Sequence, residues 1–201
     1  MKVLTILAIP LFLLGLIIAL GFALNLGNYQ ILFNTISDLG SSIYTPYPMI
    51  INGTFMLSPI FLSFYFFNLY RIVKKHVREH NILYRLANTG FSFFIIMNIA
   101  FFFTGIFSVE VSVLYHNICT IFVFLPLLFG EIILGLVIFI KRLFPRYISV
   151  LMISGHLFVS MFYFIFQTPI LEWITFFILL LWGLPLSINM IGNKKNLELI
   201  K

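Results

Sequence analysis

Six long apolar segments, separated by short polar connections, account for most of the chain. Each is close to the roughly 20 mainly apolar residues that a helix needs to cross a bilayer. Lipid offers no hydrogen-bond partners to exposed backbone groups, so segments of this kind must be helices. The pattern predicts an all-α protein, a polytopic membrane bundle of six transmembrane helices, which are Val3–Asn25, Met49–Tyr70, Leu86–Phe107, Val113–Ile140, Ile148–Gln167 and Trp173–Ile191.

The composition agrees with a single transmembrane domain over residues 1–201. Apolar residues make up 62% of the chain and charged residues only 9%, whereas soluble domains carry about 25% charged residues. The first apolar run, Val3 to Leu24, exceeds the about 7–15 residues of a cleavable signal peptide. We therefore expect this run to be retained as the first span.

The basic residues predict the orientation. In the six-span arrangement all Lys and Arg residues fall on one side, while Asp38, Glu110 and Glu172 fall on the other. The positive-inside rule then places both termini in the cytoplasm of a multi-pass protein of the cell membrane. The net charge of +6 is spread over short blocks, which argues against a nucleic-acid partner. The basic residues are Lys2, Arg71, Lys74, Lys75, Arg78, Arg85, Lys141, Arg142, Arg146, Lys194, Lys195 and Lys201.

The polar connection between the first two spans contains Asp38, the single Asp of the chain, followed by Gly40, Ser41 and Ser42. One interpretation is structural: the carboxylate accepts backbone N–H bonds in a turn, and Gly40 takes a positive φ. The other is functional, with Asp38 as a cation ligand, a general base or a carboxylate that orients a histidine. Both remain open from the sequence.

Further polar residues lie at or near the same predicted outer surface. His116 lies about one turn below the outer end of the fourth span, beside Asn117, and an ionisable residue within a span usually faces the bundle interior or water. Glu110 precedes the same helix, where a carboxylate favours the helix dipole, so we expect it to cap the helix. Ser112 is an alternative cap.

These residues suggest two kinds of site if they converge. Asp38, His116 and either Ser41 or Ser42 would provide an orienting group, a base and a nucleophile. Aspartate, glutamate and histidine together could instead hold a divalent metal. No G-x-S-x-G or H-E-x-x-H motif is present, so neither a reaction nor a metal or cofactor is assigned. The candidate ligand-binding residues are Asn52, Glu110, Asn117 and His156.

Two ionisable residues lie deeper in the predicted spans. His156, beside Ser154 and Gly155 in the fifth span, is expected to form an interhelical hydrogen bond. Its pairing with His116 as haem ligands fits poorly because the two lie at different depths. Glu131, in the fourth span, is either a proton site or, as we favour, a residue that reaches the basic inner connection.

Several short motifs occur in order along these spans: Ile36-Ser37-Asp38-Leu39-Gly40, Asn52-Gly53, Gly105-Ile106-Phe107 and His116-Asn117. With these motifs the chain resembles the domain-of-unknown-function 998 family of small multi-span membrane proteins over nearly its whole length. One departure is Ser108, where the family often has a proline. The resemblance implies a multi-helix membrane bundle and no particular reaction.

Three functions fit these features. We favour a binding or accessory membrane protein with an outward-facing polar site, whose partners are the bilayer and other membrane-protein subunits, because the connections are short. The alternative is a membrane-embedded hydrolase or transferase that acts on a lipid or amphiphile at the outer leaflet. Transport would need a polar path linking His116, Glu131 and His156, for which the spans have few polar residues.

Overall fold

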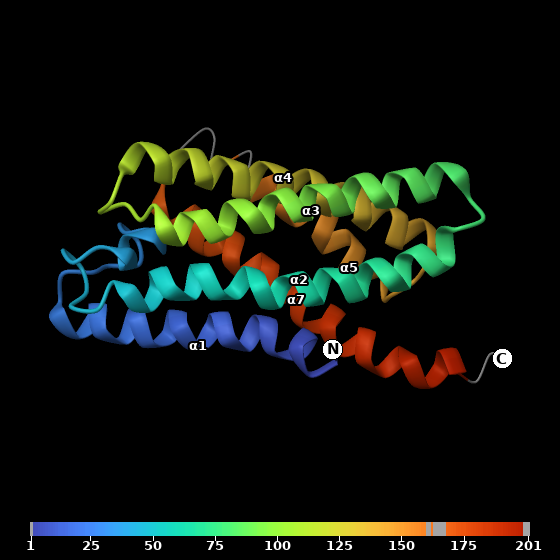
Figure 1. Cartoon of the computed structure of the whole chain (residues 1–201), viewed down its shortest axis with the longest axis horizontal. Coiled ribbons are helices and arrows are strands. Elements are labelled where there is room, and N and C mark those ends of the chain that lie inside the picture. The colour runs from blue at the N-terminus through green and yellow to red at the C-terminus, as the bar shows by residue number, and fades with distance from the viewer. Residues whose placement is uncertain (1, 160–161, 163–167, 199–201) are drawn as a thin grey trace.

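A computed structural model describes residues 2–159, 162 and 168–198, and within these ranges the protein consists of helices and their connections (Figure 1). Besides the α-helices there is one 3₁₀ helix, η1, and one π-helical stretch, η2. In chain order the elements are α1 (Lys2–Leu26), η1 (Ser37–Gly40), α2 (Met49–Val77), α3 (Asn81–Ile106), α4 (Val113–Lys141), α5 (Arg146–Val150), η2 (Leu151–Gly155) and α7 (Pro169–Glu198).

Five of the described helices are long and apolar enough to cross a membrane, which confirms the helical membrane bundle. They correspond to the first four predicted spans and the last one. The predicted fifth span, 148–167, corresponds to a shorter apolar helix described over Arg146–Val159, and most of its remainder lies outside the described residues.

Two helices run beyond the predicted spans. Helix α2 continues to Val77 rather than ending at Tyr70, and α3 begins at Asn81 rather than at Leu86. Basic residues are costly in hydrocarbon but not in a helix, so α2 extends past Tyr70 by roughly 10 Å at 1.5 Å per residue. There the Lys74 ammonium lies over the rings of Tyr70 and Tyr84, 5.1 and 5.7 Å from their centroids.

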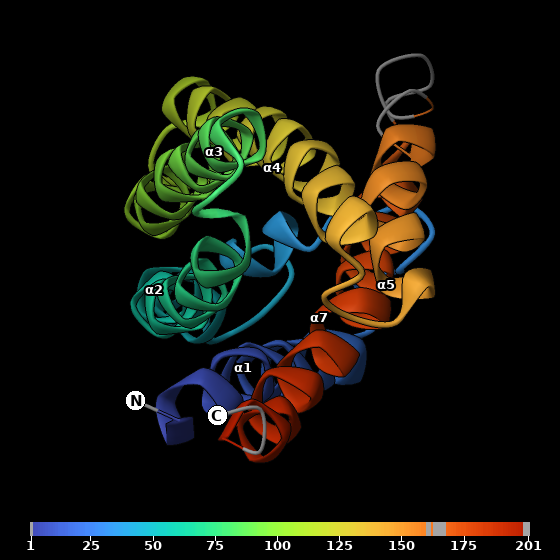
Figure 2. The same cartoon turned by 90° about the vertical axis from the view of Figure 1, so that its right-hand side faces the viewer.

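The helices form a ring (Figure 2). Helices α1 to α4 pack each on the next, α5 and η2 pack on α4, and α7 closes the ring against α1, α2, α5 and η2. We call the end that carries connections 27–48 and 107–112 the loop end. The opposite end, with connections 78–80 and 142–145, is the basic end. Helix α1 begins and α7 ends towards the basic end (Figure 1).

Two hydrophobic clusters stabilise the ring. The larger one lies towards the basic end and joins residues of α1 to α5, η2 and α7, including Leu69, Leu134 and Ile148. The second lies at the loop end, where Ile36 and Leu39 of the 27–48 connection pack with Trp173 and with residues of α1 and α2. The outer helix faces expose large apolar side chains such as Leu14 and Ile17, as expected of lipid-facing surfaces.

Candidate functional site

Asp38 orders its own connection. Its Oδ2 accepts a hydrogen bond from the backbone N–H of Thr35 at 2.8 Å, and the Thr35 hydroxyl oxygen accepts one from the backbone N–H of Asp38 at 3.1 Å. This reciprocal pair precedes η1, where Leu39 is fully buried. Of the two interpretations that the sequence left open for Asp38, the structure therefore confirms the turn.

The positive φ predicted for Gly40 is wrong. Among the described residues, positive φ occurs at Gly27 and Arg142, and Gly40 belongs to η1. Gly40 is instead required by close packing, because a Cβ there would lie 2.3 Å from Oδ1 of Asn52. The Asn52 amide donates to the Gly40 carbonyl oxygen at 3.1 Å. Asn52 thus attaches the connection to α2.

The two serines that follow Gly40 are engaged in loop contacts. The Ser42 hydroxyl donates to Oε1 of Glu110, and the Ser42 backbone N–H donates to Oε2 at 3.4 Å. The Ser41 hydroxyl oxygen accepts from the backbone N–H of Ile43 at 3.3 Å. Both bonds of Glu110 therefore tie the 27–48 connection to the 107–112 connection.

The helix cap predicted for Glu110 is wrong, because Ser112 takes that role. Ser112 is the residue before α4, and its side chain accepts a hydrogen bond from the backbone N–H of Tyr115 at 3.4 Å. Ser112 is the alternative cap that the sequence suggests.

His116 is buried beneath the 107–112 connection. Its Nδ1 lies 2.9 Å from the carbonyl oxygen of Phe107, so this nitrogen carries the hydrogen and donates it. The neighbouring Asn117 is exposed. Within the described residues, no hydrogen bond joins His116 to Asp38, Ser41 or Ser42, and no three metal-binding side chains cluster. The geometry of a nucleophile, a base and an orienting group is therefore not assembled.

The start of α7 provides anchors for the 27–48 connection that the sequence interpretation missed. Oε1 of Glu172 accepts a hydrogen bond from the Ser37 hydroxyl at 3.2 Å, and the Trp173 indole N–H donates to the carbonyl oxygen of Asn34 at 3.0 Å. The sequence signal that could have indicated these anchors is an acidic residue, Glu172, directly before Trp173 at the start of the last predicted span. These bonds hold η1 against the loop end of the ring.

Tyr29 is enclosed by the same anchors. Its hydroxyl donates to the carbonyl oxygen of Thr35 at 2.6 Å. Burial raises the pKa of Tyr29, and the carboxylates of Glu172 and Asp38 add to the rise because they disfavour a second negative charge nearby. The hydroxyl therefore stays protonated and serves as a donor.

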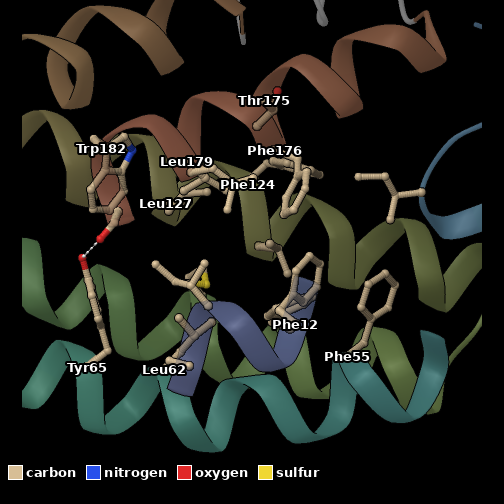
Figure 3. Close-up of a pocket in the computed structure, with 18 of the residues that line it drawn as sticks. Phe12, Phe55, Leu62, Tyr65, Phe124, Leu127, Thr175, Phe176, Leu179 and Trp182 are labelled. Carbon is tan, nitrogen blue, oxygen red and sulfur yellow. Dashed lines mark hydrogen bonds between the residues drawn. The ribbon is translucent and has the colours of Figure 1, made fainter. Parts of the chain in front are cut away.

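An apolar cavity of about 160 Å³ occupies the centre of the ring (Figure 3). Tyr65 and Trp182 lie at one end, with the Tyr65 hydroxyl donating to the carbonyl oxygen of Gly183 at 3.2 Å. Phe12, Phe55 and Phe176 lie towards the other end. The residues lining this central cavity are Ala8, Ile9, Phe12, Ile36, Phe55, Leu62, Tyr65, Phe66, Met97, Phe101, Val123, Phe124, Leu127, Glu172, Thr175, Phe176, Leu179, Leu180, Trp182 and Gly183.

The central cavity lies where α7 faces α3 and α4. Helix α7 packs on α1, α2, α5 and η2, whereas no comparable packing joins its described residues to α3 or α4. Ile36, directly before η1, contributes to the cavity wall, and η1 appears within the ring when it is viewed end-on (Figure 2). The 27–48 connection therefore covers the loop end of the central cavity.

His156 lies away from the loop end and contacts Glu131 through Nδ1 and Oε2. Glu131 is fully buried and His156 is 1% exposed. The expectation that Glu131 reaches the basic connection is therefore wrong, because its carboxylate contacts His156, the residue that follows η2. His116 and His156 belong to separate sites.

No family model, curated protein or solved structure matches this chain. Function must therefore be argued from the geometry.

Proposed function

We propose that this protein is a membrane protein that binds one hydrocarbon chain of a lipid or other amphiphile in its central cavity. The cavity itself carries this proposal. Engineered apolar cavities of about 150 Å³ stay free of water and bind molecules such as benzene, and the central cavity, within a bundle of apolar helices, has a similar volume of about 160 Å³.

The lining favours an apolar occupant of this kind. Phenylalanine rings from four helices, Phe12, Phe55, Phe101 and Phe176, surround one end of the cavity, and Phe12 contacts each of the other three with ring centroids 5.2 to 6.1 Å apart. Glu172 is the charged side chain in the wall, but its carboxylate is bonded to Ser37. An ionic headgroup would therefore remain outside the cavity.

Binding is better supported than catalysis at the loop end. The groups that a hydrolase or transferase would need are engaged in bonds that order the connection: Asp38 with Thr35, Ser42 with Glu110, and His116 with a backbone carbonyl. The accessory role fits this arrangement, since a bound chain and a closed loop end require no reaction.

We further propose that the loop end faces outward, with both termini in the cytoplasm of the cell membrane. The support is the distribution of charge, because Lys and Arg residues of α2, α3, α4 and α5 lie at or near the basic end. Membership of the domain-of-unknown-function 998 family is likewise proposed from the short motifs alone.

Tryptophan fluorescence tests chain binding directly. The chain has two tryptophans, so Trp173→Phe leaves Trp182, a wall residue that is 2% exposed, as the reporter. A fatty acid brominated at mid-chain quenches a tryptophan that it contacts. Titrated into the purified protein in a non-ionic detergent, it should quench Trp182 saturably, at about one molecule per protein.

Two matched substitutions on α4 separate cavity binding from contact with the detergent belt. Leu127 lines the cavity and is 3% exposed, whereas Leu125 is 41% exposed. Leu127→Phe should raise the dissociation constant obtained from the quenching curve about tenfold, equivalent to about 1.4 kcal/mol. Leu125→Phe should leave this constant unchanged. Val123→Phe, at another residue of the cavity wall, provides a second variant in which the cavity is filled. Quenching that does not saturate, or that is the same in all variants, would reject the proposal.

A further inference from the structure

A second polar site lies away from the loop end and takes no part in the proposed chain binding. Glu131 of α4 and His156, the residue after η2, contact each other in the interior of the bundle. Glu131 lies ten residues before Lys141, and His156 lies ten residues after Arg146. At 1.5 Å per residue both side chains are about 15 Å from the basic ends of their helices. In a hydrocarbon core of about 30 Å, this places them near mid-depth.

Because Glu131 and His156 are buried, their surroundings favour the state in which the pair has no net charge. An isolated ionised side chain in such a site is expensive, whereas a histidine and a carboxylate that share one proton have no net charge. Removing the shared proton leaves a carboxylate beside a neutral imidazole, and adding another leaves an imidazolium beside a neutral acid. A sealed site therefore holds one shared proton.

No other charged group offsets the pair within the described residues. Helix α2 contributes Tyr65, whose hydroxyl is bonded to Gly183 and lies within electrostatic range of Glu131. Helix α3 faces this part of α4 with Gly90 and Phe94, which are not titratable. The buried polar side chains Trp182 of α7 and Ser149 of α5 carry no charge. The pair is thus the local site at which charge can change.

Several buried polar atoms of the pair and of the helices in this half of the bundle have no hydrogen-bond partner among the described residues. They are Glu131 Oε1, His156 Nε2, Ser149 Oγ and Trp182 Nε1. Buried polar atoms normally bond to protein or to water. Ser149 lies seven residues before His156, on the side of the basic end. These atoms can therefore bond to water molecules located between the pair and the basic end.

The helix between Ser149 and His156 is irregular. Leu151–Gly155 form η2, a π-helical stretch, and π-helical turns inserted into α-helices are frequent at functional sites. This stretch packs against Gly135 of α4, where a Cβ would lie 2.8 Å from Ile153 and 3.3 Å from the carbonyl oxygen of Ser149. The chain from Ser149 to Ile153 is therefore in close contact with α4 at Gly135, between Glu131 and the basic end.

We propose that Glu131 and His156 form a proton-binding site that holds one proton while α4 and α5 are packed together and exchanges it at the basic end when they separate. The proton passes between the shared Oε2–Nδ1 position and water, and no other bond is made or broken. This gives the protein a second function, coupling a helix movement to proton transfer.

Cysteine labelling measures this movement. In a Cys119→Ala background, Ser149→Cys places a thiol at a fully buried position on the basic-end side of the pair, and Arg146→Cys places one at the exposed start of α5. The full-length protein in lipid vesicles is treated with a membrane-impermeant thiol reagent between pH 5 and pH 9. The rate at Ser149→Cys is divided by that at Arg146→Cys, which cancels the pH dependence that the two thiols share, and the double Gln variant described below accounts for the remainder.

The expected ratio is lowest where the pair is neutral. It should rise towards acid or alkaline pH by up to about tenfold per pH unit, the limit for gain or loss of one proton. The Glu131→Gln/His156→Gln variant cannot change charge at this site, so its ratio should be independent of pH. If this variant does not fold, His156→Gln alone leaves a single carboxyl group and should confine the rise to the alkaline side.

Infrared spectroscopy identifies the group that carries the proton. In a Glu172→Gln background, which removes another carboxyl group from inside the bundle, the carbonyl band of a protonated carboxyl group should appear in the His156→Gln variant at neutral pH and be lost when Glu131→Gln is added. Glu110→Gln, at an exposed position, should leave the band unchanged. A labelling ratio that does not change with pH in the parent, or one equally pH-dependent in the double Gln variant, would overturn the proposal. Fluorescence quenching of Trp182 tests chain binding separately.

Discussion

Single polar side chains at the loop end serve the structure of one connection. Asp38 and Thr35 bond to each other's backbone N–H groups, and Asn52 bonds to the carbonyl oxygen of Gly40. In an apolar protein of this kind each such bond matters, because a buried donor or acceptor without a partner costs about 1–3 kcal/mol. The residues that suggest a catalytic site in the sequence therefore have an immediate structural purpose.

Two substitutions of Asp38 should distinguish the role of its acceptor oxygen from the role of its negative charge. Asp38→Ala removes the acceptor for the backbone N–H of Thr35 and should lower the free energy of unfolding by about 1 kcal/mol. Asp38→Asn retains an oxygen acceptor and should be close to the parent protein. Thermal unfolding in detergent measures both. An equal loss in Asp38→Asn would mean that the negative charge itself is required.

Gly40→Ala should be more harmful than a similar change one turn into α2. The added Cβ would lie 2.3 Å from Oδ1 of Asn52, whereas a Cβ at Gly53 meets nothing within 4 Å. Overpacking of this kind typically costs about 1–3 kcal/mol, and Gly53→Ala should be neutral or slightly stabilising. The two melting temperatures, measured side by side, check this. Matching values would show that η1 does not lie against Asn52.

At the scale of elements, the contact between α4 and α5 has the greatest consequence. The two helices pack on each other and are joined by the short 142–145 connection, so residues equally far from it along the two helices lie at the same depth. This arrangement brings Glu131 to His156. The π-helical stretch η2 precedes His156, so the His156 side chain points in a different direction from the one that a regular α-helix would give it.

Gly135→Ala should disturb this contact. Its Cβ would lie 2.8 Å from Cγ1 of Ile153 and 3.1 Å from Cβ of Met152, so the helices must move apart. We expect a loss of about 1–3 kcal/mol in unfolding free energy, measured by thermal unfolding followed by size-exclusion chromatography. Gly21→Ala on α1, where a Cβ meets nothing within 4 Å, is the control. Equal stability of both variants would contradict the close approach of α4 and η2.

At the scale of the whole molecule, the helices enclose an apolar space instead of filling it completely. Helix α7 closes the ring, and the 27–48 connection covers the loop end. The proposed chain-binding cavity and the Glu131–His156 pair share a neighbour, since Tyr65 belongs to the cavity wall and lies within electrostatic range of Glu131. If occupancy of the cavity alters the packing of these residues, binding and protonation must affect each other equally.

The orientation of the whole molecule can be measured with single cysteines. In a Cys119→Ala background, Asn28→Cys labels the loop end and Glu79→Cys the basic end, and both positions are exposed. On intact cells a membrane-impermeant maleimide should react with Asn28→Cys, and with Glu79→Cys only after the cells are opened. This follows from retention of the basic residues in the cytoplasm. The reverse pattern would contradict the proposed orientation.

The sequence by itself determined the properties that each segment has on its own. Apolar length requires helices, and the loop sequence around Asp38 favours a turn in which its carboxylate accepts a backbone N–H bond, and the structure confirms both. The ends of α2 and α3 were misplaced because hydropathy reports where hydrocarbon ends and not where a helix ends. Orientation depends on charge relative to a membrane and stays a prediction.

Only the tertiary structure decided which side chains meet. The requirement for glycine at position 40 comes from Asn52, the partner of Glu110 is Ser42, and the partner of Glu131 is His156. Equal distances from basic residues hinted at the last pairing, but contact also depends on the rotation of each helix about its axis. That rotation is set by packing among all the helices, and the same packing leaves the central cavity open.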